Sequence, residues 1–135
     1  MDRNLQLLGI ARKAGFLAIG GEAASASAKS GSAKAIITAG DASEGAKRRA
    51  RRDAEFCGAA FADTSYTKFE LGNITGRGSP GTLAVTDSGL AAGFLKGLAE
   101  DDPERYGDMA GRLPGAESLP NRERKMATGK RRTAR

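Results

Sequence analysis

The sequence predicts a single α/β domain over residues 1–100, with helices on both faces of a sheet, followed by a tail over residues 101–135. Segments with helical spacing of apolar residues alternate with short apolar runs typical of strands as far as residue 99. The clearest run, residues 35–39 (AIITA), contains no charge and suits a strand that helices cover on both faces. A domain of about 100 residues can bury a core of its own.

Apolar spacing and glycines place the individual elements. Gly15 is the stop of the first helix, Gly20 and Gly21 open the second, and Gly31 closes it where a left-handed residue is favoured. Phe69 is expected to lie in the core. The helices are expected over residues 3–14, 21–30, 43–57 and 67–73 and after Asp87 or Ser88, and the strands over residues 34–39, 59–62 and 82–86.

The predicted helix over residues 43–57 combines an alanine face with a basic surface. Asp41 and Ser43 are expected to cap it, and Ala46, Ala50 and Ala54 recur on the face that would pack on the sheet. Like charges four residues apart repel, so the basic run favours a polyanionic partner, and the alternative is a solvated face balanced by nearby acids. The run contains Lys47, Arg48, Arg49, Arg51 and Arg52.

Composition and charge narrow the class of function. The chain has 22 Lys and Arg against 16 Asp and Glu, and this net charge of +6 moderately favours a nucleic-acid partner. It has no histidine and one cysteine, which argues against zinc sites, histidine acid–base catalysis and an intrachain disulfide. No apolar run approaches the about 20 residues of a membrane span, and no signal peptide is visible. We expect a cytoplasmic, non-enzymatic protein with no cofactor, metal or membrane partner.

The composition changes after residue 100. Pro103, Pro114 and Pro120, many charges and few aromatic residues predict a flexible segment. Its end is basic, which indicates an arm that adds electrostatic grip, although a solvated tail without a role is the alternative. Near this end Glu123 is surrounded by Arg122, Arg124, Lys125, Lys130, Arg131, Arg132 and Arg135.

Four segments carry a resemblance to a known family: LLGIARKAG, SGSAKAIITAGDAS, YTKFELGNITGR and LAVTDSGLA. In this order, residues 5–98 resemble the large-subunit ribosomal protein seven-Ae superfamily, whose members bind kink-turn RNA, and within it the bacterial YlxQ-like branch. The resemblance implies a three-layer α/β/α sandwich with a small four-stranded mixed sheet. It also implies binding of structured or ribosomal RNA, with the ribosome or another RNA-processing protein as a further partner.

In that family the RNA lies against the start of the second helix and a loop before the last strand. The corresponding segments here are Gly20-Gly21-Glu22 and Gly76-Arg77-Gly78-Ser79. Members that bind kink-turns tightly carry Gly-x-Asn-Glu-x-x-Lys at the helix start, where this chain keeps only the glycine and has Glu22, Ala23 and Ala26. Alanine has no group with which to read a base edge. Two hypotheses stay open: an RNA-binding protein with an altered motif, or a protein-interaction module whose RNA readout has decayed.

The glycine-opened helix start presents free amide groups and a positive dipole end, which suit a phosphate. Lys29 and Lys34, with Arg12 and Lys13, are predicted to flank this start and clamp phosphates. Glycines beside Arg77 would let the loop approach a ligand closely. We expect all these groups to gather along one rim of the molecule. The predicted RNA-binding residues are Gly20, Gly21, Glu22, Lys29, Lys34, Lys47, Arg48, Arg51, Gly76, Arg77 and Gly78.

Overall fold

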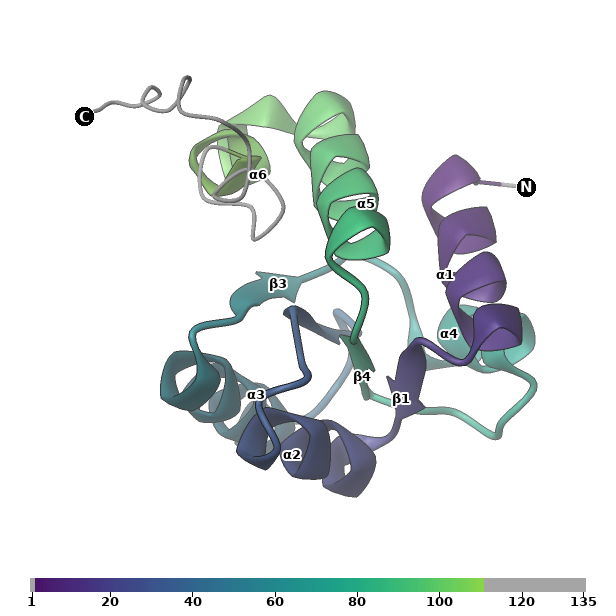
Figure 1. Ribbon diagram of the computed structural model, residues 1–135. Coiled ribbons are helices and arrows are strands. Elements are labelled where there is room, and N and C mark those ends of the chain that lie inside the picture. Colours follow the sequence, from purple (N-terminus) through teal and green to yellow (C-terminus); the bar gives the residue numbers. More distant parts are fainter. Residues whose placement is uncertain (1, 111–135) are drawn as a thin grey trace.

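The computed structural model describes residues 2–110 and confirms the α/β class: a four-stranded mixed sheet lies between helices (Figure 1). Residues 111–135, most of the predicted tail, lie outside the described residues. In chain order the elements are α1 (Arg3–Ala14), β1 (Leu17–Ile19), α2 (Gly21–Lys29), β2 (Ala35–Thr38), α3 (Glu44–Cys57), β3 (Ala60–Asp63), α4 (Lys68–Thr75), β4 (Thr82–Val85), α5 (Ser88–Asp101) and α6 (Pro103–Ala110).

Two elements differ from those expected from the residues. Strand β1 has only three residues, too few for a periodic signal, and it forms because all three pair with β4. The end of α5 at Asp101 and the whole of α6, Pro103–Ala110, lie where composition placed the tail. Pro103 begins α6, a position that suits its fixed φ, and Tyr106 is buried. The helical part of the chain therefore reaches Ala110.

The strand order β1-β4-β2-β3 gives the sheet two distinct ends. Strand β4 runs antiparallel to both β1 and β2, and β2 is parallel to β3. Gly20, Thr38, Asp63 and Thr82 therefore meet at one end, which we call the Thr82 end, and the other is the Val85 end. Helices α2, α3 and α4 follow the carboxyl ends of β1, β2 and β3, so all three begin at the Thr82 end.

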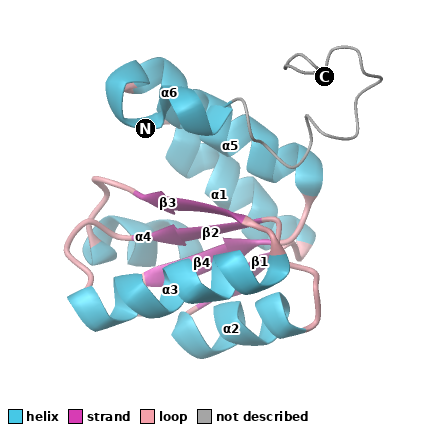
Figure 2. Cartoon of the chain, turned by 90° about the vertical axis from the view of Figure 1, so that its left-hand side faces the viewer, coloured by secondary structure: helices cyan, strands magenta, loops and turns pink. Residues whose placement is uncertain are grey.

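Helices α2 and α3 cover one face of the sheet, and α1, α4 and α5 cover the other (Figures 1 and 2). Successive side chains of β2 point to opposite faces of the sheet and fill both cores. Ile36 packs against α2 and α3, whereas Ile37 packs in the core on the other face. The predicted alanine face of α3 is confirmed, with Ala50 and Ala54 buried against the sheet. Small side chains in this layer let α2 and α3 pack closely together.

Most predicted helix signals operate as expected. Ser43 caps α3 by accepting from the Ala46 amide at 3.0 Å, and Gly31 adopts a φ of 80° after α2. Asp41 does not cap α3: its Oδ1 accepts from the Lys68 amide at 2.8 Å and so helps to start α4. Phe69 was expected in the core but is 69% exposed, because it lies on the outer side of the short helix α4.

The two tyrosines of the chain are expected to make the folded protein less stable at alkaline pH. Tyr66 donates to Asp2 Oδ1 at 3.1 Å and Tyr106 to the Asp63 carbonyl at 2.7 Å. Burial raises the pKa of both phenols above the ordinary value. In the unfolded chain they ionise near pH about 10, so their contribution to the free energy of unfolding should be constant below that pH and fall above it. Urea unfolding at pH 8 and pH about 10.5 checks this, and a Tyr66→Phe/Tyr106→Phe variant with the same fall would contradict it.

Candidate nucleic-acid interface

The start of α2 is an open helix end at the Thr82 end of the sheet. Gly20 has φ 101° and ψ 160°, a conformation that side-chain-bearing residues rarely adopt, and its amide donates to the Thr82 carbonyl at 2.9 Å. No side chain caps α2, whereas α1, α3, α4 and α5 each have a capping side chain. The first amide groups of α2, from Gly21 to Ala23, therefore point outward with no intrahelical acceptor.

Arg49 of α3 lies beside this helix end. A Cβ atom on Gly21 would be 3.7 Å from Arg49 Nη1. Arg49 Nε donates to Ser25 Oγ at 3.0 Å, and Ser25 bonds in turn to Asp53. The two polar residues thus hold the guanidinium at the start of α2. A hollow of about 60 Å³ lies here, lined by Gly21, Ala46, Arg49, Ala50, Asp53 and Thr82.

Arg49 belongs to the basic run of α3 but is not among the residues predicted from the sequence to bind RNA. The available signal was Asp53, which follows Arg49 by four residues and so shares its side of α3. What the sequence could not show was Ser25, because only the packing of α2 on α3 brings it to the pair.

The loop over residues 76–81 ends beside the same helix start. Its last residue, Gly81, accepts from the Ala39 amide at 2.9 Å, and the next residue, Thr82, accepts from Gly20. Gly76 ends α4 with a φ of 73°, and the Arg12 guanidinium lies beside it, 3.7 Å from where a Cβ would stand. Residues 77–79 are exposed. The structure therefore places the end of this loop, at Gly81, beside the start of α2, and its first residue, Gly76, beside Arg12 of α1.

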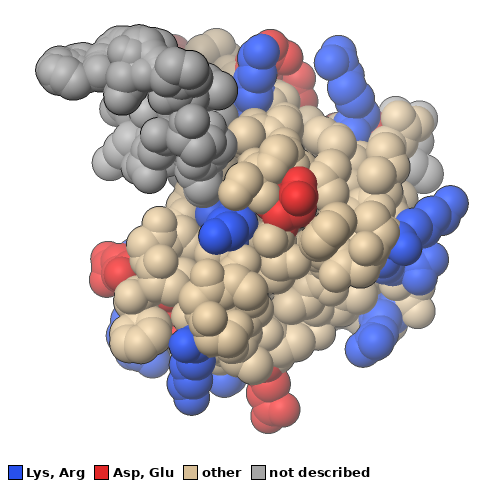
Figure 3. Space-filling model, viewed as in Figure 1, with Lys and Arg blue, Asp and Glu red and all other residues tan. Residues whose placement is uncertain are grey.

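Lys29 and Lys34 do not flank the start of α2 as expected. Lys29 lies in the last turn of α2, about 12 Å along the helix axis from Gly21 at a rise of about 1.5 Å per residue. The Lys34 amide donates to the Val85 carbonyl at 2.8 Å, so this residue belongs to the Val85 end. Figure 3 shows blue side chains at the lower left, in the upper centre, at the top and along the right-hand edge, with uncharged surface and some red side chains between them. The cations are thus spread over more than the single expected rim.

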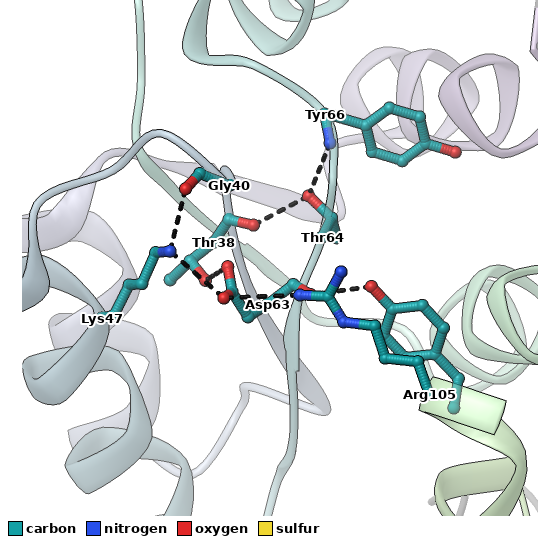
Figure 4. A network of polar contacts seen from close by, with 8 residues as sticks. Thr38, Gly40, Lys47, Asp63, Thr64, Tyr66 and Arg105 are labelled. Atoms are coloured by element: carbon teal, nitrogen blue, oxygen red, sulfur yellow. Dashed lines mark hydrogen bonds and ion pairs between the residues drawn. The ribbon is translucent and has the colours of Figure 1, made fainter. Parts of the chain in front are cut away.

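The basic residues of α3 also divide into groups with different roles. Lys47 turns inward: its Nζ lies 2.9 Å from the Gly40 carbonyl and 3.2 Å from Asp63 Oδ2, and its side chain is 14% exposed (Figure 4). The Arg51 guanidinium lies over the Phe61 ring at 4.9 Å. Arg48 and Arg52 are exposed and form no ion pair with another residue between 2 and 106.

Other features limit what this interface can do. Glu22 is exposed in the first turn of α2, where it stabilises the helix dipole but opposes an approaching phosphate. Across residues 2–106 no group of three acidic or cysteine side chains is placed to hold a metal ion. None of the described helices is long and apolar enough to cross a membrane.

Comparison with known proteins finds similarity in structure only. No protein-family model and no curated protein matches the sequence. A protein of unknown function from Bacillus halodurans matches with a TM-score of 0.67 and 20% identity, over 73% of this chain and 98% of that one. The 15.5 kD RNA-binding protein of Giardia lamblia matches with a TM-score of 0.57 and 17% identity, over 71% of this chain and 82% of that one. At these identities the likeness shows a shared fold.

Proposed function

We propose that this protein binds structured RNA, such as ribosomal RNA, and holds its phosphates at the start of α2. One observation carries the proposal: α2 begins with uncapped amides after Gly20, and the Arg49 guanidinium lies beside Gly21, with which it lines one small hollow. Phosphate oxygens accept hydrogen bonds from backbone amides and from the planar guanidinium of arginine, and the positive end of the helix dipole attracts their charge. The fold shared with an RNA-binding protein of Giardia lamblia supports the same conclusion.

The same geometry indicates a binder that depends on the RNA backbone. Ala23 and Ala26 are exposed on α2 but offer no donor or acceptor to a base edge. Phosphate contacts position an RNA without reading its sequence, so recognition would rest on backbone shape. Kink-turn RNA, which the resemblance implies, is therefore the first structured RNA to compare with a plain duplex and a single strand.

Replacing Arg49 with glutamine is expected to weaken RNA binding about tenfold, because it removes one charge-assisted contact to phosphate. The slope of log affinity against log salt should also fall by about 0.7 to 0.9, the value for one released counterion. Fluorescence anisotropy with labelled kink-turn RNA at about 50 and 200 mM salt measures both quantities.

The matched control is Lys96→Gln, which removes one exposed charge from α5 on the opposite helical layer. It should change the affinity only through the long-range field of the protein, by much less than the Arg49 variant. Equal losses in the two variants would contradict the proposed site.

A second candidate function is protein interaction, which one surface favours. A hollow of about 230 Å³ lies between α1 and α4, and its wall includes Ile10, which is 55% exposed, and Ile74. Arg12 and Lys13 line the same hollow. If kink-turn, duplex and single-stranded RNA all fail to bind in the titrations above, this surface becomes the better candidate.

A further inference from the structure

Phe56 of α3 is the most exposed large apolar side chain between residues 2 and 106, with 74% of its surface open to solvent. Arg52 and Arg49 precede it by four and seven residues, which places all three on one side of the helix. We call these three residues the α3 stripe. An exposed phenylalanine following two arginines on one stripe is not explained by the packing of α3, whose buried side is formed by Ala50 and Ala54.

The stripe leads from the proposed phosphate site to the other end of the sheet. Arg49 lies at the start of α2, and the bond between Ser25 and Asp53 fixes how the two helices align. Near the other end, Cys57 Sγ lies 4.0 Å from the Ala33 carbonyl, in the segment that follows α2. Figures 1 and 2 show α2 and α3 side by side on one face of the sheet.

Positive charge is also present where the stripe ends. Lys29 occupies the last turn of α2, and the amide of Lys34 bonds to Val85 at the same end of the sheet. The two lysines that do not flank the start of α2 thus belong to the end of the molecule where Phe56 lies. The axial distance from Arg49 to Phe56 is about 10 Å at a rise of about 1.5 Å per residue.

We propose that the α3 stripe binds a single-stranded RNA segment, with an unpaired base stacked on Phe56 and the backbone on Arg49 and Arg52. This inference rests on the proposed function and adds a second contact, which selects RNAs with an unpaired extension beside the structured part. Aromatic side chains bind single strands by stacking, because every base has an accessible face once it leaves a duplex. The bases of a regular duplex stack on one another and cannot reach an isolated ring on a helix.

The charge around Phe56 favours RNA over a protein partner for this stripe. Protein-binding hot spots centre on aromatic residues within a patch that excludes water. Here the other members of the stripe are arginines. Asp53 lies on the same side of α3 but bonds to Ser25, and Arg52 forms no ion pair with any residue in the range 2–106. A polyanion satisfies these charges, whereas an apolar protein surface would have to desolvate them.

The absence of tryptophan from the chain allows a direct test with the Phe56→Trp variant. Its fluorescence should be quenched to saturation by a decauridylate, because a stacked base is in contact with the indole. A blunt-ended RNA duplex should quench it far less. The matched control is Phe69→Trp, since Phe69 is 69% exposed on α4, in the opposite helical layer. Equal quenching of the two variants by the decauridylate would overturn the proposal.

A second variant, Phe56→Leu, separates this inference from the proposed function. Its affinity for a kink-turn hairpin with a ten-nucleotide single-stranded extension should fall about tenfold, and its affinity for the blunt hairpin should be unchanged. An equal effect on both RNAs would overturn the α3 stripe, even if Arg49→Gln behaves as proposed. If Arg49→Gln and Lys96→Gln lose equal RNA affinity while the decauridylate still quenches Phe56→Trp, the α2 site alone is rejected. Circular dichroism verifies that each variant is folded.

Discussion

Replacing Gly72 with alanine is expected to destabilise the protein by about 3 kcal/mol, because the new methyl group would overpack a closed contact. Gly72 lies inside α4, and the 76–81 loop folds back over it. A Cβ atom there would overlap the Gly78 carbonyl oxygen, which is backbone and cannot rotate away as a side chain could. The melting temperature should fall by roughly 10 °C or more, as measured by thermal unfolding.

The same substitution should affect binding below its melting temperature. The loop that Gly72 accommodates ends beside the start of α2, so a displaced loop should lower RNA affinity even in the folded variant. Gly93→Ala in α5 is the control, because its Cβ would meet Leu7 Cδ1 at an ordinary 3.6 Å. Alanine favours the helix there and should stabilise the protein by about 0.5 to 1 kcal/mol. A Gly72 variant as stable as this control would show that the loop does not pack on α4 as described.

The fold could be predicted well because its signals are local. The charge-free run around Ile36 and the alanine spacing of α3 identify elements that pack on the sheet. Strand β1 could not be predicted from its residues, because three residues carry no periodicity and its partner β4 is more than 60 residues away in sequence. Helix α6 was not predicted because composition alone suggested disorder. The burial of Tyr106 depends on a distant contact, in which its hydroxyl donates to the Asp63 carbonyl.

The candidate site was predictable only where it depends on the backbone. Gly20 needs a positive φ, and a glycine pair at a helix start indicates that conformation in the sequence. The direction of a charged side chain is a tertiary property. Neighbouring cations of α3 therefore diverge, with Lys47 turned to Asp63 and Arg49 turned to the start of α2. A basic run identifies the helix, and packing decides which of its charges can contact RNA.

Replacing Asp63 with alanine is expected to destabilise the protein by about 2 kcal/mol, since it leaves a largely buried cation without its partner. The carboxylate lies 3.2 Å from Lys47 Nζ and 3.5 Å from Arg105 Nη2, and it accepts from the buried Thr38 hydroxyl at 3.0 Å (Figure 4). Its side chain is 27% exposed, so the loss should be smaller than for a fully buried pair. Urea unfolding at neutral pH measures the change.

A double-mutant cycle with Lys47→Met tests whether this pair is structural. Methionine keeps the length of the stem without a charge, so the double variant should lose less stability than the two single variants added together. Losses that simply add would contradict a coupled pair. The same Lys47→Met variant should bind kink-turn RNA as tightly as the unmodified chain, in contrast to Arg49→Gln. Lys47 and Arg49 are two residues apart on one helix. This contrast would therefore distinguish a lysine that stabilises the fold through Asp63 from an arginine that contacts RNA.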